Sequence, residues 1–149
     1  MRSIRTFASV LVLVSALSFT ASAQCKGIVK KNMDKLTPFT HNGQLNSVSL
    51  NEGGVADFKI TCYTGLTYRL ALAADPILGK VTFRVLDEDN NEVYNSKDNN
   101  ATSWDFNVGS SQELTVEITV PLTDKNIRGC AALLVGFKEP KNTGGLRPM

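Results

Sequence analysis

Alternation of apolar and polar residues, repeated in run after run from residue 58 onward, is the feature that most constrains the fold of this chain. Such runs lie at residues 58–62, 66–72, 81–85, 104–108 and 114–120. Successive side chains of an extended strand point to opposite faces, so each run would place one face in a core and the other in water. This pattern is typical of antiparallel sheets with one solvated face.

Two further segments fit the same architecture. The run CAALLVGFK (residues 130–138) is apolar on both faces, which predicts a strand covered on both sides and central in its sheet. The segment LNSVSL (residues 45–50) lies between the turn signals Asn42-Gly43 and Gly53-Gly54, so we expect a shorter strand there.

Turn-forming residues separate these runs at short intervals. Examples are Thr64-Gly65 and Asp75-Pro76. The sequence therefore predicts an all-β fold, an antiparallel β-sandwich of jelly-roll-like or immunoglobulin-like type. The only helical pattern is a short one at residues 26–36, which Thr37-Pro38 would end. We expect one domain over residues 24–139 and a flexible tail over residues 140–149.

The first 23 residues have the layout of a secretory signal peptide. Arg2 and Arg5 precede an apolar run from Val10 to Phe19, and Ala21-Ser22-Ala23 provides small residues for cleavage. The apolar run is short for a membrane anchor, and no later apolar stretch approaches the roughly 18 residues of a transmembrane helix. We expect the chain to be exported, to the periplasm or outside the cell.

The charge balance gives no sign of a polyanionic partner. The net charge of +2 comes from 16 basic and 14 acidic residues, and the two arginines of the leader account for the excess. The exported part would be neutral overall, without the basic field that nucleic acids or anionic lipids attract. We expect neither nucleic acid nor a membrane as a partner.

Three cysteines follow the leader: Cys25, Cys62 and Cys130. In an oxidising compartment two of them would pair and one would remain. Spacing alone leaves all three pairings open. We favour Cys62 with Cys130, because both lie in apolar strand-like runs where a bridge could join two layers of a core.

The densest group of oxygen ligands is the segment from Asp87 to Glu92. Asp87, Asp89 and Asn91 have the alternate spacing with which a loop can turn oxygens toward one calcium ion. Glu92 stands where an EF-hand loop requires glycine, so that motif is excluded. A polar hairpin tip between VTFRVL and EVYNS is the simpler interpretation, and calcium is the less favoured alternative.

Residues for catalysis are scarce. His41 is the only histidine, beside Asn42-Gly43, and we interpret it as a solvated loop residue rather than part of a triad or a zinc site. No phosphate loop, Cys-x-x-Cys pair or nucleophile elbow is present. We therefore predict no catalytic residues and no cofactor. Trp104 and Tyr68 belong to apolar faces, whereas Tyr63 and Tyr94 are free to form a sugar-binding platform.

The chain resembles small secreted or periplasmic proteins of Bacteroidetes, and its strand pattern is similar to the bacterial pre-peptidase C-terminal domain. The resemblance spans residues 36–138 and is carried by four runs: GGVADFKITCYTGLTYRLALA, GKVTFRVLDEDNNEVYNS, WDFNVGSSQELTVEITVP and RGCAALLVGFK. It implies a β-sandwich and a non-catalytic envelope module, and it transfers no active-site residue.

We accordingly predict an exported module that binds an envelope protein or glycan, or has a structural role, with loops or a sheet edge as the contact. Two alternatives remain. One is a small hydrolase that uses carboxylates of the Asp87 to Asp98 loops. The other is a calcium-stabilised module for adhesion or carbohydrate binding.

Overall fold

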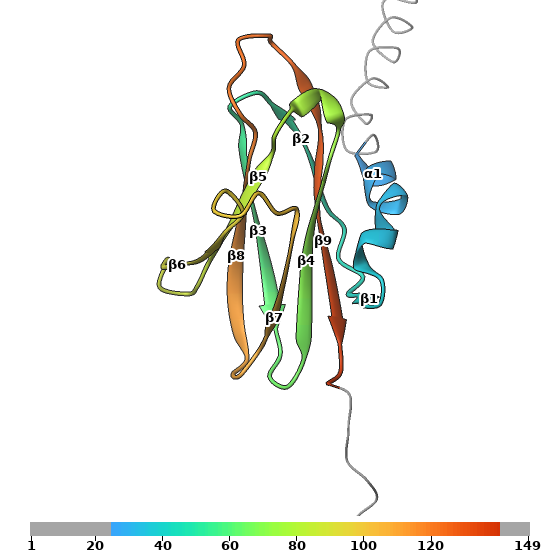
Figure 1. Ribbon diagram of the computed structural model, residues 1–149, viewed down its shortest axis with the longest axis vertical. Helices are drawn as coiled ribbons and strands as arrows, with labels where there is room; N and C mark the ends of the chain where they lie inside the picture. Colours follow the sequence, from blue (N-terminus) through green and yellow to red (C-terminus); the bar gives the residue numbers. More distant parts are fainter. Residues whose placement is uncertain (1–24, 141–149) are drawn as a thin grey trace, which may run out of the picture.

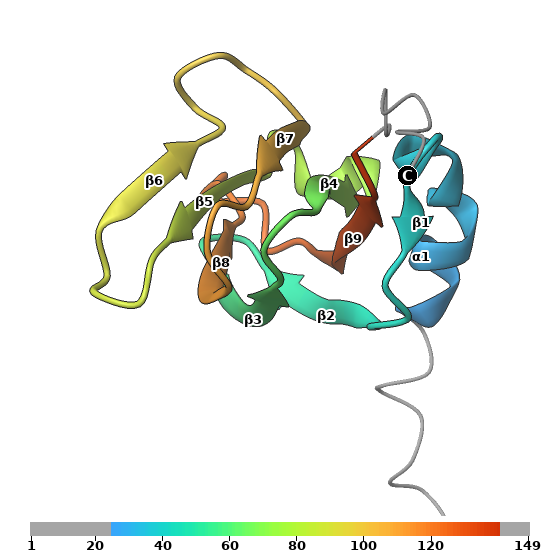
Figure 2. The ribbon, with the colours of Figure 1, turned by 90° about the horizontal axis from the view of Figure 1, so that it is seen from below.

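The computed structural model describes residues 25–140 and shows two antiparallel β-sheets packed face to face (Figures 1 and 2). The first sheet has the order β1-β9-β4-β7, with β2 also paired to β9, and the second has the order β3-β8-β5-β6. The predicted antiparallel β-sandwich is confirmed. The strands are β1 (Thr40–His41), β2 (Asn46–Asn51), β3 (Val55–Cys62), β4 (Thr67–Ala74), β5 (Thr82–Leu86), β6 (Glu92–Asn95), β7 (Ser103–Asn107), β8 (Gln112–Thr119) and β9 (Arg128–Lys138).

Side chains from both sheets meet in one core. The alternation read from the sequence decides which of them face inward: Leu114, Val116 and Ile118 of β8 are buried, as are Phe83 and Val85 of the neighbouring β5. Full burial of one such side chain stabilises the fold by about 1.5–3 kcal/mol. The core between the sheets therefore follows from the period of two.

β9 is the central strand of the first sheet, between β4 on one side and β1 and β2 on the other. Leu133 and Val135 face the second sheet, whereas Ala132 and Leu134 face away from it and are equally buried. The prediction of a strand covered on both faces is confirmed.

A short helical segment covers that outer face of the first sheet (Figure 2). The predicted helix over 26–36 is present as α1 (Lys26–Lys31) followed by the 3-10 helix η1 (Met33–Leu36). Alanines on the strands leave room for close packing of these helices. The contact consists of Ile28, Val29, Leu36 and Phe39 on Ala71, Ala73, Ala132 and Leu134. A further 3-10 helix, η2 (Pro76–Leu78), follows β4.

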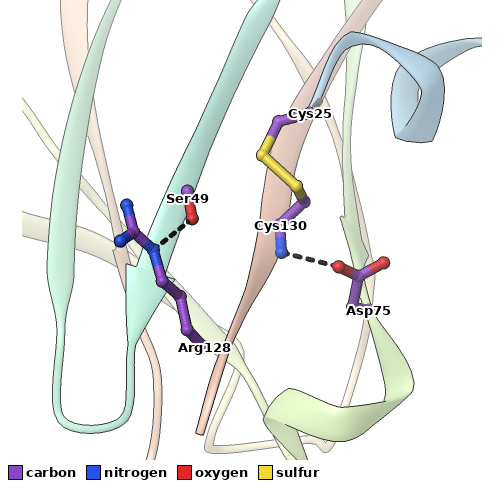
Figure 3. Close-up of a disulfide and its surroundings, with 5 residues drawn as sticks. All are labelled: Cys25, Ser49, Asp75, Arg128 and Cys130. Atoms are coloured by element: carbon purple, nitrogen blue, oxygen red, sulfur yellow. Dashed lines mark hydrogen bonds between the residues drawn. A yellow bond between two sulfur atoms is a disulfide. The ribbon is translucent and has the colours of Figure 1, made fainter. Parts of the chain in front are cut away.

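The disulfide differs from the one expected. Cys25 is bonded to Cys130, and Cys62 is a buried free thiol, so the pairing of Cys62 with Cys130 is wrong (Figure 3). The reason is the alternation of β9. Cys130 has the same parity as Ala132 and Leu134, so it faces the helical layer, while Cys62 lies in the core between the sheets. The two side chains are on opposite sides of a sheet.

Two expectations concern residues outside this description. The signal peptide at 1–23 and the tail beyond Pro140 lie outside the described residues. Within residues 25–140, no helix has the length and apolar character needed to cross a bilayer.

Candidate binding cleft

A cleft of about 400 Å³ opens at the end of the sandwich where β3 gives way to β4. The chain turns there through Tyr63 to Leu66, and the link between β1 and β2 approaches from the first sheet. Four separate segments thus supply its walls. The lining residues are Asn42, Gln44, Lys59, Thr61, Tyr63, Leu66, Tyr68 and Phe137.

Hydrogen bonds hold the polar wall of the cleft in place. Gln44 N donates to Asn42 Oδ1 over 2.9 Å, which closes a tight polar turn after β1. The side-chain amide of Gln44 then reaches across the opening and donates to the backbone oxygen of Lys59 at 3.4 Å. The amides of this turn are exposed, so they are available to a ligand.

The apolar wall is formed around Tyr68. Its ring is buried and packs against Phe106 and Phe137, and its hydroxyl accepts a hydrogen bond from the backbone N–H of Tyr63 at 3.0 Å. Burial raises the pKa of Tyr68, so the phenol is neutral at physiological pH. Its hydrogen bond and ring contacts give Tyr68 a structural role in this wall.

Tyr63 is the most accessible aromatic residue of the cleft. Tyr63 is 59% exposed, because it continues the outward-facing odd-numbered positions of β3 just beyond the end of the strand. Lys59 is also exposed and pairs with Glu113 over 3.0 Å, an ion pair that solvent screens strongly. The cleft therefore offers an aromatic face, amides and a partly neutralised ammonium group. Such a surface can bind a ligand but holds no nucleophile with an adjacent base.

The cleft was not predicted from the sequence as a site. Its residues come from segments far apart in the chain. Only Tyr63 pointed toward it, because the sequence did not assign this aromatic residue to the core. Of the four aromatic residues considered as a platform, Tyr94 and Trp104 stack on each other with ring centroids 4.6 Å apart, at the opposite edge of the sandwich. Both are half-buried against the core, so no joint platform with Tyr63 forms.

His41 is not a solvated loop residue as expected. It lies in β1, paired with Gly136, and is half-buried. Its Nδ1 accepts a hydrogen bond from Gly43 N at 3.1 Å, so the ring serves the turn that leads to the cleft. Within residues 25–140, no carboxylate lies within ion-pair distance of this imidazole. The arrangement contains no triad.

The segment from Asp87 to Asn91 forms the turn between β5 and β6, as the favoured interpretation had it. Asp87 Oδ1 accepts hydrogen bonds from the backbone N–H groups of Asp89 and Asn91, and its Oδ2 accepts one from the Asn91 side chain. These bonds, the Asn91 side-chain bond first, lower the pKa of Asp87. Residues 25–140 contain no group of three or more histidine, cysteine, aspartate or glutamate side chains that could hold a metal ion. Calcium at Asp87, Asp89 and Asn91 stays a prediction.

A carboxylate with a strongly lowered pKa, that of Glu52, lies at the other end of the sandwich. Glu52 accepts hydrogen bonds from the hydroxyl and N–H of Thr123 and from the N–H groups of Lys125 and Asn126, at 2.7–3.2 Å. These bonds, led by that of the Thr123 hydroxyl, lower the pKa of Glu52 from 4.5 to about 2. All these donors belong to one loop, so the low pKa of Glu52 results from the hydrogen bonds that hold this loop in place. The low pKa therefore does not mark an active site.

Comparison with known proteins finds a similar fold but identifies no family. No family model matches the chain, and no curated protein matches it. The resemblance to exported β-sandwich proteins is therefore supported only at the level of the fold. Among solved structures, the chain is similar to PliG of Aeromonas hydrophila, described as a periplasmic lysozyme inhibitor of g-type lysozyme. The TM-score is 0.50 at 9% identity, over 64% of this chain and 85% of that one.

Proposed function

We propose that this chain is an exported, non-catalytic module that binds another protein through the cleft around Tyr63. The observation that carries the proposal is the composition of the cleft. An exposed aromatic ring lies beside exposed amides and hydroxyls, with no catalytic group among the lining residues. Tyrosine in such a setting gives a large contact area at low entropic cost, and it is enriched where proteins meet.

Two further observations support export and binding. The disulfide between Cys25 and Cys130 is of a kind that persists in oxidising compartments, in agreement with the leader-like first 23 residues. One solved structure with a similar fold is a periplasmic protein that is described as an inhibitor of an enzyme. A likeness at this identity supplies the fold alone, so lysozyme is a first candidate partner and not an inherited one.

The experiment is a binding and inhibition assay against purified lysozymes, with g-type lysozyme included. We expect the protein to bind one of them, or an envelope protein captured by cross-linking, with Tyr63→Ala weakening the complex by about tenfold or more. The matched control is Val93→Ala, since Val93 is also an exposed apolar side chain but lies on β6 at the other edge of the second sheet.

Three results would count against the proposal. Equal losses of affinity for Tyr63→Ala and Val93→Ala would show that the cleft is not part of the interface. Retention on purified peptidoglycan without any protein partner would favour a glycan module instead. Hydrolytic turnover abolished by Asp87→Asn or Asp89→Asn would support the carboxylate enzyme.

A further inference from the structure

β3 is an edge strand whose outer side has no strand partner among the described residues. It pairs only with β8, and the N–H of Val120 donates to the backbone oxygen of Gly54 at 2.9 Å. Backbone groups point alternately to the two sides of a strand, so the even-numbered residues of β3 bond β8. The backbone groups of Val55, Asp57, Lys59 and Thr61 therefore point to the open edge.

The hydrogen bond made by Gln44 agrees with this assignment. Its amide donates to the oxygen of Lys59, an odd-numbered residue, and occupies one acceptor of the open edge. The N···O distance of 3.4 Å is long for such a bond, so a backbone N–H of a neighbouring strand can compete with this amide for the oxygen of Lys59. The edge thus has the donors and acceptors of a strand that lacks its neighbour.

The outer-face side chains of β3 have a self-complementary order. Asp57 and Lys59 are separated by one residue, both are exposed, and Asp57 makes no ion pair within residues 25–140. Exposed apolar side chains flank them: Val55 at the start of the strand, 53% exposed, and Tyr63 just beyond its end. The open edge thus carries an acidic and a basic side chain two positions apart, which an antiparallel copy of the same strand would match.

We propose that the partner is a second copy of this chain, joined edge to edge through β3 in antiparallel register with Phe58 opposite Phe58. In this register Asp57 of each copy lies opposite Lys59 of the other, so two opposite-charge pairs form across the two-fold axis. Val55 lies opposite Thr61 in the same way. The interface is isologous and closes on itself, which a dimer requires.

The backbone is compatible with this register. It places odd-numbered residues opposite odd-numbered ones, and these are the residues whose N–H and C=O groups point outward on both copies. Each such pair can form both hydrogen bonds of a closely spaced antiparallel pair. A shift by one residue would set backbone groups that point to the open edge opposite groups that already bond β8. Registers that pair odd-numbered with even-numbered residues are therefore excluded.

The dimer would join the second sheets of both copies into one continuous sheet. Asp57 and Val55 of the second copy would lie opposite Lys59 and Thr61, which both line the cleft. The second copy would therefore cover the side of each cleft that β3 forms. This inference does not depend on the identity of the protein that the cleft binds.

The proposal is tested by sedimentation velocity over a wide concentration series. The sample is the protein as it is purified after processing and export by the expressing cell. We expect a reversible dimer. In Asp57→Lys, lysines at 57 and 59 would face each other, and in Lys59→Asp, aspartates would do so. Each variant alone should dimerise about tenfold more weakly or worse, because like charges opposite each other destabilise paired strands.

Mixing these two variants provides the decisive measurement, since the mixture restores opposite charges at both positions. We expect the mixture to form a heterodimer that is tighter than the dimer of either variant alone. Lys97→Asp is the matched control, because Lys97 is an exposed lysine beyond β6 at the opposite edge of the same sheet, and it should leave the dimer intact. Circular dichroism of each variant establishes that it is folded.

Thr61→Pro tests the backbone independently of charge. It removes an outward N–H that β8 does not use, so it should prevent dimerisation while the sandwich stays folded. Amide exchange at Asp57, Lys59 and Thr61 should slow as concentration rises. A wild-type monomer over the whole series, or variants that dimerise like the wild type, would overturn the proposal even if the cleft binds a protein.

Discussion

Cys25 and Cys130 join the first described residue of the chain to the central strand of the first sheet (Figure 3). The backbone N–H of Cys130 also donates to Asp75 Oδ2 at 2.7 Å, so the beginning of β9 is held from two directions. The bonded residues are 105 positions apart in the sequence. A cross-link that closes so long a loop restricts the unfolded chain strongly.

Loss of this disulfide should destabilise the fold. Cys25→Ser removes the restraint on α1 and is expected to lower the free energy of unfolding by about 2–4 kcal/mol. Denaturant unfolding measures the loss, and a reductant should lower the wild-type midpoint but not that of Cys25→Ser. Cys62→Ala should keep the response to reductant. Peptide mapping that found Cys62 bonded to Cys130 would contradict this prediction.

Stability should depend on pH through Glu52. Its pKa is about 2 in the folded protein against 4.5 for the ordinary side chain. Because the folded value is the lower one, the unfolded state takes up the proton first, and the stabilisation is complete above pH 4.5 and is lost as the pH falls toward 2. Thermal unfolding measured across this range should show a falling midpoint.

Glu52→Gln supplies the control for that pH dependence. The amide cannot accept all the bonds from Thr123, Lys125 and Asn126, so the midpoint should be lower at pH 7 and its decrease below pH 4.5 shallower than in the wild type. Asp87→Asn changes another carboxylate of lowered pKa, in the β5–β6 turn, and should alter the local turn without removing the effect of Glu52. Identical pH profiles for wild type and Glu52→Gln would contradict the assignment.

Arg69 is expected to anchor η1 to the first sheet. Its guanidinium makes two bonds of 2.7 Å to Asp105, donates to the backbone oxygen of Thr37 at 3.0 Å and lies 4.5 Å from the ring centre of Phe39. Lysine cannot reproduce this planar set of donors. We expect Arg69→Lys to cost about 1–2 kcal/mol in denaturant unfolding.

Lys138 provides the comparison for Arg69. Its ammonium lies 4.5 Å from the same ring of Phe39, but it makes no side-chain hydrogen bond within the described residues. An exposed cation over an aromatic ring stabilises by about 0.5–1 kcal/mol. Lys138→Ala should therefore cost less than Arg69→Lys, and the reverse order would show that the hydrogen bonds of Arg69 do not anchor η1.

The strands could be predicted because their signal is local. A period of two in the sequence fixes which side chains are buried, as with Val116 and Ile118, whatever the order of the strands. β9 was recognised as a central strand for a different reason, because its sequence is apolar on both faces. Strand order and the disulfide depend on contacts between distant segments, and the apolar setting shared by Cys62 and Cys130 did not show that they face opposite sides of a sheet.

The cleft depends on such long-range contacts even more. Gln44, Lys59 and Phe137 have ordinary surroundings in the sequence and become neighbours only when the two sheets close. The acidic segment at Asp87 had a stronger local signal, yet its carboxylate is used within its own turn. A dense local group of ligand atoms therefore did not point to the candidate cleft, which the topology assembles from distant segments.

Two glycines should respond in opposite ways to alanine and thereby test the packing of the helical layer. A Cβ on Gly136 of β9 would lie 2.8 Å from Phe39 Cβ and 3.1 Å from Leu36, so Gly136→Ala should displace η1 and cost about 1–3 kcal/mol. A Cβ on Gly27 of α1 meets nothing within 4 Å, so Gly27→Ala should stabilise the helix by about 0.5–1 kcal/mol. Denaturant unfolding measures both changes. Equal effects of the two substitutions would mean that η1 does not pack on β9 as described.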